Sequence, residues 1–330
     1  MQRFRNVLVG IDLSDADRLV SSELSPSSRA AVDQAIWLAK ETGAKVTFFT
    51  ALVPCLELGP DYVDVNLQPH LTAAIESVRA EANEAMKTIV AEARAAGVEA
   101  TFSHSCGTGW IELCRMVVEE NFDLLIVGSH KRHLLGRVML GSSGNKLLRK
   151  CPCPVWVVSP HHSVTVRSIL VATDFTEASD LAVEIAKSLT EMFGAQLHVL
   201  YAVEYPHMLT YKAINIPAEY LTDYRFQVYR EAKREFDSML ARYGLTELVG
   251  EDNRHLVSGH PSNAILDTAE SKNVDLVVMG SVARSGLKGL LMGNTAESVL
   301  PKLKCSVLAI KPSGFVCPLK FAEEVAMAMA

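Results

Sequence analysis

The chain has 330 residues, and its 32 Lys and Arg against 38 Asp and Glu give a formal net charge of −6 at pH 7. An acidic chain is a poor partner for nucleic acid, whose phosphates select basic surfaces. No apolar run approaches the roughly 20 residues that a membrane-spanning helix needs, and the N-terminus reaches Asp12 too early for a secretory signal peptide. We therefore expect a soluble, cytoplasmic protein with no membrane span and no nucleic-acid partner.

Short apolar runs alternate along the chain with longer stretches whose apolar residues recur every three or four positions. In the first half the expected strands are Asn6–Ile11, Lys45–Leu52, Ala100–His104, Leu124–Gly128 and Val155–Val158. In the second half the expected strands are Ile169–Thr173, Leu197–Val203, His255–Ser258, Leu276–Gly280 and Ser306–Ile310, with helices at Ala178–Phe193, Pro217–Tyr243, Ser262–Ser271 and Thr295–Leu303. This alternation predicts α/β domains, each with five parallel strands, helices on both faces and right-handed crossovers.

The two halves end in the same way. Residues 122–160 and 274–312 align without a gap and share 12 of 39 residues, at a constant offset of 152. A repeat of this length means two copies of a whole domain, because solenoid repeats are far shorter. The match reaches back to the chain start, where VLVGIDLS from Val7 corresponds to ILVATDFT from Ile169. A polar insertion within 15–25 explains why the offset differs there.

These matches predict domains at 1–160 and 165–312, each of ordinary domain size, followed by a tail at 313–330. Seven cysteines, an odd number, fit neither a disulfide framework nor a zinc site. The pair Cys151 and Cys153 has only Cys305 as a counterpart in the second half. We therefore expect a buried cysteine that opens a strand, and no metal.

Ligands of doubly wound sheets bind beyond the carboxyl ends of the strands, where the strand order reverses. In each half an aspartate follows the first strand, and a glycine ends the fourth strand before a loop and a new helix. The residues so placed are Asp12, Gly128, Gly141, Ser142 and Ser143 in the first half and Asp174, Gly280, Gly293, Asn294 and Thr295 in the second. Ser142 and Asn294 are good N-cap residues, and Glu297 lies where a capping box needs it. A helix start with free N–H groups favours an anion.

At these residues the chain resembles the universal stress protein family, in its tandem, E-type arrangement of two domains in one polypeptide. The resemblance rests on ATDF from Ala172, GNTAES from Gly293 and CPCPVWVV from Cys151, and it covers about residues 5–312. It implies two tandem adenine-nucleotide alpha-hydrolase-like, Rossmann-like sandwiches, each with strand order 3-2-1-4-5. It also implies a role in stress response.

Nucleotide-binding members of this family carry G-x2-G-x9-G-[S/T], whose glycines and final hydroxyl cradle the phosphates and ribose. This chain keeps the first and third glycines in both halves. Lys131 and Ala283 stand at the second glycine, and the final hydroxyl is kept in Ser142 but replaced in Asn294. A residue with a Cβ does not freely replace glycine where backbone must approach a phosphate. Both loops are therefore altered from the family motif. The resemblance implies that ATP or another adenine nucleotide binds through such an altered loop in one or both halves.

The two altered loops differ from one another. In the first half Lys131 offers a charge, and Asn145 stands where the second half has Glu297, so no carboxylate opposes an anion at that helix start. The competing interpretation is a solvated basic loop. In the second half Ala283 is a small replacement that leaves room for a nucleotide. The sequence ranks neither half above the other.

Two further features have competing interpretations. Asp12 and Asp174 fit either the floor of a site near adenine or ribose, or the capping of the next loop through nearby N–H groups. His130 and His133 lie three residues apart, but the second half has no counterparts and no carboxylate or cysteine accompanies them. We expect loop histidines there and no metal ligand.

Segment 203–229 is rich in aromatic residues although the chain as a whole is only 7% aromatic. Its position after the second strand of the second half suits a lid over an apolar or lipid-like ligand. The competing interpretation is packing between domains or subunits, where tyrosine is also enriched. The lid residues would be Tyr205, Tyr211, Tyr220, Tyr224 and Phe226.

Catalysis has the least support, since the sequence has no P-loop, no nucleophile elbow and no paired general acid and base. Any ATP hydrolysis would be slow and incidental. The remaining classes are a nucleotide-sensing stress protein and a nucleotide-independent scaffold or apolar-ligand module. The family resemblance also implies that the fifth strands, 154–158 and 306–310, pair in an internal pseudo-dimer that hides Trp156. A homodimer and other protein partners stay open.

Overall fold

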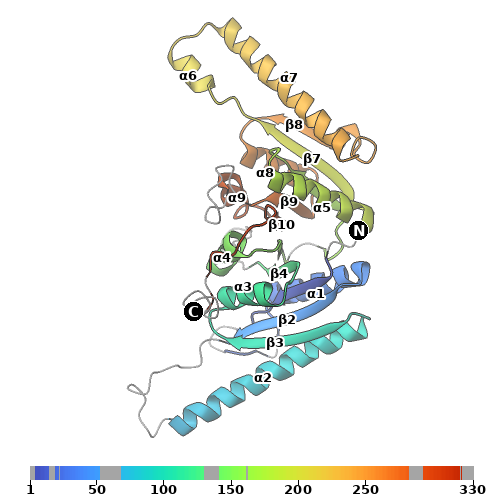
Figure 1. Ribbon diagram of the computed structural model, residues 1–330, viewed down its shortest axis with the longest axis vertical. Helices are drawn as coiled ribbons and strands as arrows, with labels where there is room; N and C mark the ends of the chain where they lie inside the picture. Colours follow the sequence, from blue (N-terminus) through green and yellow to red (C-terminus); the bar gives the residue numbers. More distant parts are fainter. Residues whose placement is uncertain are drawn as a thin grey trace, which may run out of the picture. The chain divides into compact units, whose positions relative to one another are not determined.

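The computed structural model describes residues 4–14, 19–21, 23–52, 68–129, 141–160, 163–281, 293–319 and 321. The chain divides into two compact units. Unit 1 comprises the described residues up to Thr165 together with those from Gly314 onward, and unit 2 those between Val166 and Ser313. Each unit is an α/β sandwich (Figure 1).

Unit 1 has a parallel sheet with strand order β3-β2-β1-β4-β5. Helices α1 and α2 pack on one face, and α3 and α4, which contact each other, pack on the opposite face. The elements in chain order are β1 Asn6–Gly10, α1 Pro26–Thr42, β2 Lys45–Leu52, α2 Gln68–Ala95, β3 Ala100–Cys106, α3 Gly109–Glu119, β4 Leu124–Gly128, α4 Ser142–Lys150 and β5 Val155–Val158.

Unit 2 repeats this plan with the order β10-β9-β6-β7-β8, which is the same 3-2-1-4-5 order counted within the unit. The predicted fold class is therefore confirmed in both units. The elements are β6 Ser168–Ala172, α5 Glu177–Phe193, β7 Gln196–Val203, α6 Met208–Ala213, α7 Ala218–Arg242, the 3-10 turn Glu251–Asn253, β8 Arg254–Ser258, α8 Pro261–Ser271, β9 Leu276–Gly280, α9 Asn294–Val299 and β10 Ser306–Ile310.

The central strands are apolar without alternation because helices cover both of their faces. In β1, for example, Val7, Leu8 and Val9 have no exposed surface. An aspartate shared by both halves fixes the start of each first strand. Asp123 accepts the Arg5 N–H at 2.7 Å, and Asp275 accepts the Arg167 N–H at 2.8 Å. This shared contact explains why both halves have an aspartate at this position.

The helices after the second strands extend far beyond the core of their units (Figure 1). Among the residues of α2 whose burial the structure describes, the first buried one is Ala82, and residues 72–81 are exposed or half-buried. In α7 the first buried residue is Ala232, fourteen positions after the helix begins at Ala218. Only the C-terminal halves of these helices pack on the sheets.

Two local expectations for unit 2 differ from the structure. The helix expected at Thr295–Leu303 ends at Val299 as α9, and Pro301 follows, which has no N–H to continue a helix. A short helix, α6, stands in the aromatic segment, where the sequence analysis predicted none. Other strand and helix bounds agree with expectation within one or two residues.

A histidine pair links β7 to β8. Nδ1 of His198 lies 3.1 Å from Nε2 of His255, and His198 is only 2% exposed. Burial lowers the pKa of His198 to about 4, with the neighbouring His255 and Lys272 adding to the effect. Burial and then Lys272 also lower the pKa of His255. Both rings are therefore neutral at pH 7, since two charged rings at this distance would repel.

This pair predicts a loss of stability on acidification. A folded-state pKa below the ordinary value near 6.5 means that the unfolded chain binds the proton more tightly, so the stabilisation is complete above about pH 6.5 and declines towards about pH 4. The loss should reach about 2–3 kcal/mol for His198. Urea unfolding of the wild type and His198→Gln at several pH values measures it, and the difference between the two curves should narrow as pH falls. A pH-independent difference would contradict this prediction.

Candidate functional site

Unit 1 contains a cavity of about 530 Å³ at the carboxyl ends of its strands. Residues from the ends of β1, β2 and β4 line it, together with the first turns of α1, α3 and α4. This crevice lies at β1 and β4, where the order of the strands reverses. The apolar lining comes from Ile11, Phe49, Ala51, Leu113, Val127 and Leu147, and the polar lining includes Asp12, Ser14, Ser27, Ser28, Thr108, Ser142 and Ser143.

Two of the three helices present uncapped N-termini to this cavity. The N-cap residues Thr108 of α3 and Gly141 of α4 make no side-chain hydrogen bond to their helices. The first-turn N–H groups of a helix have no intrahelical acceptor and carry partial positive charge. The first turn of α4 has no acidic residue, and Glu112 of α3 pairs with Arg115 at 3.1 Å. The two helix starts therefore suit an anion.

The expectation that Ser142 and Asn294 are N-caps is wrong by one position. Gly141 and Gly293 are the N-caps, and Ser142 and Asn294 are the first residues of α4 and α9. Glu297 consequently does not hold the capping-box position. A glycine N-cap has no side chain to accept a hydrogen bond, so the start of α4 keeps its N–H groups available.

Asp12 closes the loop that follows β1, as one of the two interpretations of this residue expects. Its Oδ1 accepts hydrogen bonds from the Ser14 N–H at 3.0 Å and from the Ser14 hydroxyl at 2.6 Å, which closes the loop after β1. Its backbone carbonyl accepts from the Ser28 hydroxyl at 2.9 Å, joining this loop to the first turn of α1. The same residue also lines the cavity.

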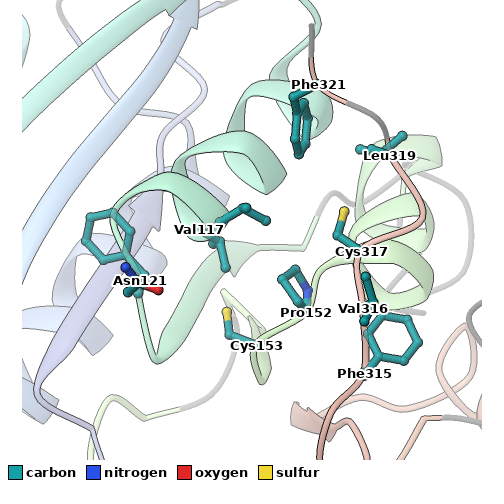
Figure 2. Close-up of a pocket in the computed structure, with 11 residues that line it drawn as sticks. Val117, Asn121, Pro152, Cys153, Phe315, Val316, Cys317, Leu319 and Phe321 are labelled. Atoms are coloured by element: carbon teal, nitrogen blue, oxygen red, sulfur yellow. The ribbon is translucent and has the colours of Figure 1, made fainter. Parts of the chain in front are cut away.

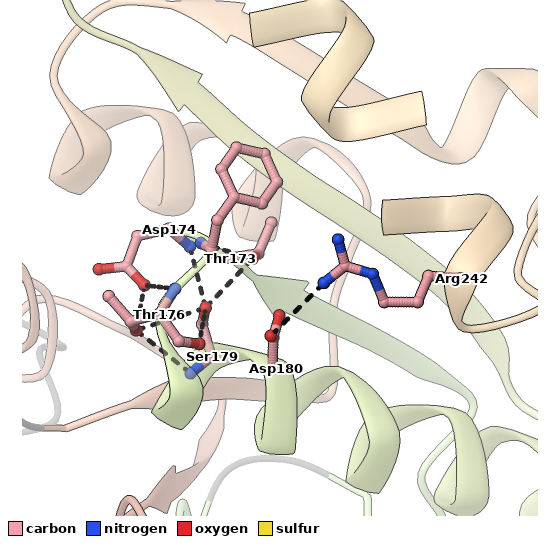
Figure 3. A network of polar contacts seen from close by, with 7 residues as sticks. Thr173, Asp174, Thr176, Ser179, Asp180 and Arg242 are labelled. Atoms are coloured by element: carbon pink, nitrogen blue, oxygen red, sulfur yellow. Dashed lines mark hydrogen bonds and ion pairs between the residues drawn. The ribbon is translucent and has the colours of Figure 1, made fainter. Parts of the chain in front are cut away.

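The corresponding loop of unit 2 is satisfied by its own side chains (Figure 3). Oδ1 of Asp174 accepts from the Thr176 N–H at 3.2 Å and from its hydroxyl at 2.5 Å. Oγ1 of Thr176 then accepts from the Ser179 N–H at 3.4 Å, which caps α5. Asp180, one residue later, lies 3.9 Å from Arg242 of α7.

The helix starts of unit 2 are more acidic and better capped than those of unit 1. Glu177 and Asp180 stand in the first turn of α5, and Glu297 stands in the first turn of α9. The ring of His260 caps α8 by accepting the Ser262 N–H at 3.3 Å. Carboxylates and an internal cap at these positions oppose an incoming anion, because they compete for the same N–H groups and the same partial charge.

The cavity brings together all the described candidates of the first half, namely Asp12, Gly128, Gly141, Ser142 and Ser143. Their counterparts Asp174, Gly280, Gly293, Asn294 and Thr295 lie at the ends of the matching elements of unit 2. Lys131, Ala283 and the histidines at 130 and 133 lie outside the described residues. The sequence analysis missed the start of α3 and the Ser27-Ser28 turn of α1, although the run Gly107-Thr108-Gly109-Trp110 directly after a strand was a usable signal.

The aromatic segment of unit 2 forms α6 and the exposed part of α7. Tyr211 and Tyr224 meet edge to face at 5.2 Å between ring centres, and the Tyr205 hydroxyl lies 2.8 Å from that of Ser258. Tyr220 and Phe226 are 61% and 60% exposed. The described rings therefore contact other protein groups or solvent. Their positions do not support the hypothesis that they form a lid over an apolar ligand.

A second cavity of unit 1, of about 430 Å³, lies between the end of α3 and the segment after Gly314. Figure 2 shows Cys317, Leu319 and Phe321 from that segment on one side, with Val117 and Cys153 across from them. The guanidinium of Arg115 lies 5.5 Å from the ring centre of Phe321. The segment thus covers apolar surface of α3.

The thiols beside this second cavity are structural. Cys114 hydrogen-bonds with Cys151 and Cys317, and Sγ of Cys151 lies 3.6 Å from Sγ of Cys153. The bond to Cys151 raises the pKa of Cys114, and burial raises the pKa of Cys151, so both stay protonated at neutral pH. The expected burial is confirmed, since Cys151, Cys153 and Cys305 are 0%, 7% and 4% exposed.

Among the described residues, no group of three or more His, Cys, Asp or Glu side chains is arranged to hold a metal ion. No helix within those residues is long and apolar enough to cross a membrane.

Comparison with known proteins agrees with this doubly wound fold. The profile of the Universal stress protein family matches residues 3–159 and again 165–311. The chain is 33% identical over 219 residues to the Universal stress protein E of Photorhabdus laumondii, covering 63% of this chain and 67% of that protein. For the Universal stress protein E of Escherichia coli K12 the identity is 30% over 214 residues, covering 63% and 66%. The matched region thus spans about two thirds of these relatives.

Solved structures share the fold over nearly the whole chain. A putative universal stress protein from Pseudomonas aeruginosa has a TM-score of 0.62 at 24% identity, covering 100% of this chain and 99% of that one. A universal stress protein from Archaeoglobus fulgidus has a TM-score of 0.65 at 20% identity, covering 93% and 98%. Since the family profile matches both halves, the chain belongs to the universal stress protein family, in its tandem, two-domain form.

The first glycine of the family motif has a packing role in this structure. A Cβ at Gly128 would fall on the carbonyl oxygen of Ser27, in the first turn of α1. The Ser27 hydroxyl also donates to the Ser129 carbonyl at 2.5 Å. At Gly280 in unit 2 the contact is looser, because a Cβ there would lie 3.2 Å from that of Ala178. Gly128 therefore lets α1 approach β4 and sets one wall of the cavity.

Matched alanine variants test this close approach. Gly128→Ala should destabilise the protein by about 3 kcal/mol, because the backbone of α1 must move, while Gly280→Ala should cost about 1 kcal/mol or less. Chemical unfolding followed by circular dichroism measures both. Equal losses for the two variants would show that the close contact at Ser27 does not constrain α1.

Proposed function

We propose that this protein is a non-catalytic stress-response protein that binds an adenine nucleotide, ATP among the candidates, in the cavity of unit 1. The observation that carries the proposal is the convergence of two uncapped helix starts, those of α3 and α4, on one cavity of nucleotide size. The phosphates would lie at Ser142 and Ser143, where first-turn N–H groups are available. The base would lie against the apolar wall formed by Ile11, Phe49 and Val127.

Unit 2 is the weaker candidate on the same physical grounds. Glu177, Asp180 and Glu297 place negative charge at its helix starts, and His260 already accepts one first-turn N–H of α8, that of Ser262. An anionic ligand would have to displace or neutralise these groups. The two halves, which the sequence alone ranks equally, are separated by this difference in charge and capping.

The composition of the described cavity lining supports the non-catalytic part of this proposal. Among the described residues around the cavity, Asp12 is the one side chain with an ionisable group. General acid–base chemistry on a phosphate needs a second positioned group or a metal. Slow, incidental ATP hydrolysis would be compatible with this proposal. We place the protein in the cytoplasm because such nucleotides are abundant there.

A matched pair of charge variants tests the site. Ser142→Asp puts a carboxylate at the start of α4, and Asn294→Asp does the same at the equivalent position of α9. Aspartate at a helix start is favourable for the helix, so both variants should fold. Isothermal titration with ATP should give roughly tenfold weaker binding for Ser142→Asp and no change for Asn294→Asp, since one opposing charge costs about 1–2 kcal/mol. The reverse pattern would move the site to unit 2, and a wild type that binds no adenine nucleotide would end the proposal.

A second candidate function is a nucleotide-independent scaffold that acts through the α6–α7 surface. The observation that favours it is the exposure of Ile214, Tyr220 and Phe226, at 62%, 61% and 60%. Large apolar side chains that remain exposed are a usual feature of interaction surfaces. Native mass spectrometry of freshly purified protein separates the candidates, because a retained nucleotide favours the first and an empty, ATP-insensitive protein favours the second.

We further propose that the two units form an internal pseudo-dimer through β5 and β10. Within its own unit each of these strands lies at one edge of the sheet, and an unpaired apolar edge is a liability that pairing removes. Polar substitution of Trp156 together with Leu308 should then prevent cooperative folding, as followed by calorimetry. Scattering data that show two independently tumbling units in the wild type would contradict this arrangement.

A further inference from the structure

The ring of Trp110 connects the cavity of unit 1 to two lysines of α4. Trp110 stands in the first turn of α3 and lines the cavity. Nζ of Lys146 lies 5.1 Å from its ring centre, and Nζ of Lys150 lies 4.9 Å from it. Both distances are within the range in which an ammonium group is attracted to an indole ring.

Lys146 and Lys150 are four residues apart on α4, so they lie on the same side of the helix. Their two ammonium groups, held against one ring, repel each other because both are positively charged. In the part of the chain that the structure describes, neither has an ion-pair partner. The C-terminal end of α4 favours a cation at Lys150, which explains one of the two charges. It does not explain Lys146, which stands in the middle of the helix. A ligand with more than one negative charge would relieve the repulsion.

The cavity offers such a ligand a mixed electrostatic environment. The starts of α3 and α4 supply partial positive charge, and α4 has no acidic residue in its first turn. The carboxylates nearby are Asp12 in the lining and Glu112 in the first turn of α3, which pairs with Arg115. The two lysines do not line the cavity, but they place two formal charges about one ring distance behind it, against the lining residue Trp110. A monophosphate could be held by the helix starts alone, whereas further phosphates would extend their charge into the field of the lysines.

We propose that Lys146 and Lys150, gathered on the ring of Trp110, make the cavity selective for a nucleoside polyphosphate over a nucleoside monophosphate, an inference that rests on the function proposed above. The lysines act as long-range positioning charges, and Trp110 holds their side chains in place. The competing explanation is that the lysine stems only shield the ring, which is 8% exposed. The two explanations differ in whether charge or stem length matters.

The experiment compares ATP, ADP and AMP binding by titration calorimetry in four forms of the full chain, the wild type and three variants. Lys146→Met with Lys150→Met keeps the stems and removes the charges, while Lys146→Arg with Lys150→Arg keeps the charges. Lys302→Met is the matched control, because Lys302 is exposed and corresponds to Lys150 at the 152-residue offset. Thermal unfolding of each form tests whether the packing around Trp110 is retained.

The wild type should bind ATP at least about tenfold more tightly than AMP. The methionine variant should lose about tenfold in ATP affinity and less than about threefold in AMP affinity, with a weaker salt dependence, since each charge removed takes away a screened attraction. The arginine variant and the Lys302 control should behave as the wild type. An equal loss for ATP and AMP, or no loss for either, overturns the inference while leaving nucleotide binding intact. A wild type that binds none of the three overturns the proposed function itself.

Discussion

The close approach of α1 to the end of β4 is the constraint on which the site of unit 1 depends. Gly128 has no side chain, so the carbonyl of Ser27 can lie against it, and the Ser27 hydroxyl bonds to the next carbonyl along the chain. The loop after β1 is then joined to the same turn through Ser28 and Asp12. Three backbone segments are thereby held around one crevice. A bulkier residue at this one position would displace all of them together.

The two units show how a duplicated fold diverges in charge while it keeps its topology. Both retain the strand order, the anchoring aspartates and the glycine at the end of the fourth strand. The differences concentrate at helix starts, where an uncapped N-terminus in one unit corresponds to a His260 cap or a first-turn carboxylate in the other. A single side chain at such a position decides whether backbone N–H groups face a ligand or an internal partner. The fold is the same whether these N–H groups are capped or free, whereas their capacity to bind an anionic ligand differs.

Sequence reasoning worked best where one physical rule dominates. Buried strands such as β4 are uninterrupted apolar runs, and the repeat at 122–160 and 274–312 identifies the duplication, so the fold followed directly. It was weaker for the site, because the start of α3 belongs to a different strand connection from the glycine motif and only three-dimensional folding brings Thr108 beside Gly141. The contacts of Trp110 with two lysines of α4 depend on helix packing, which no local pattern encodes. The predicted N-cap at Ser142 is wrong by a single residue, because the exact end of a helix depends on the hydrogen bonds of its first turn, which the sequence does not specify.

The outer halves of α2 and α7 lie beyond the cores of their units, and their side chains are mostly exposed. Substitutions on such helix surfaces change stability by only about 0.5 kcal/mol in either direction. Residues 72–81 and 218–231 can therefore accept mutations that the sheets and the crevice cannot. In a lineage of duplicated domains these two arms are where new surface chemistry can accumulate at little cost to folding. Each half of the chain thus combines a tightly packed scaffold with an exposed helical arm that can change in sequence without loss of the fold.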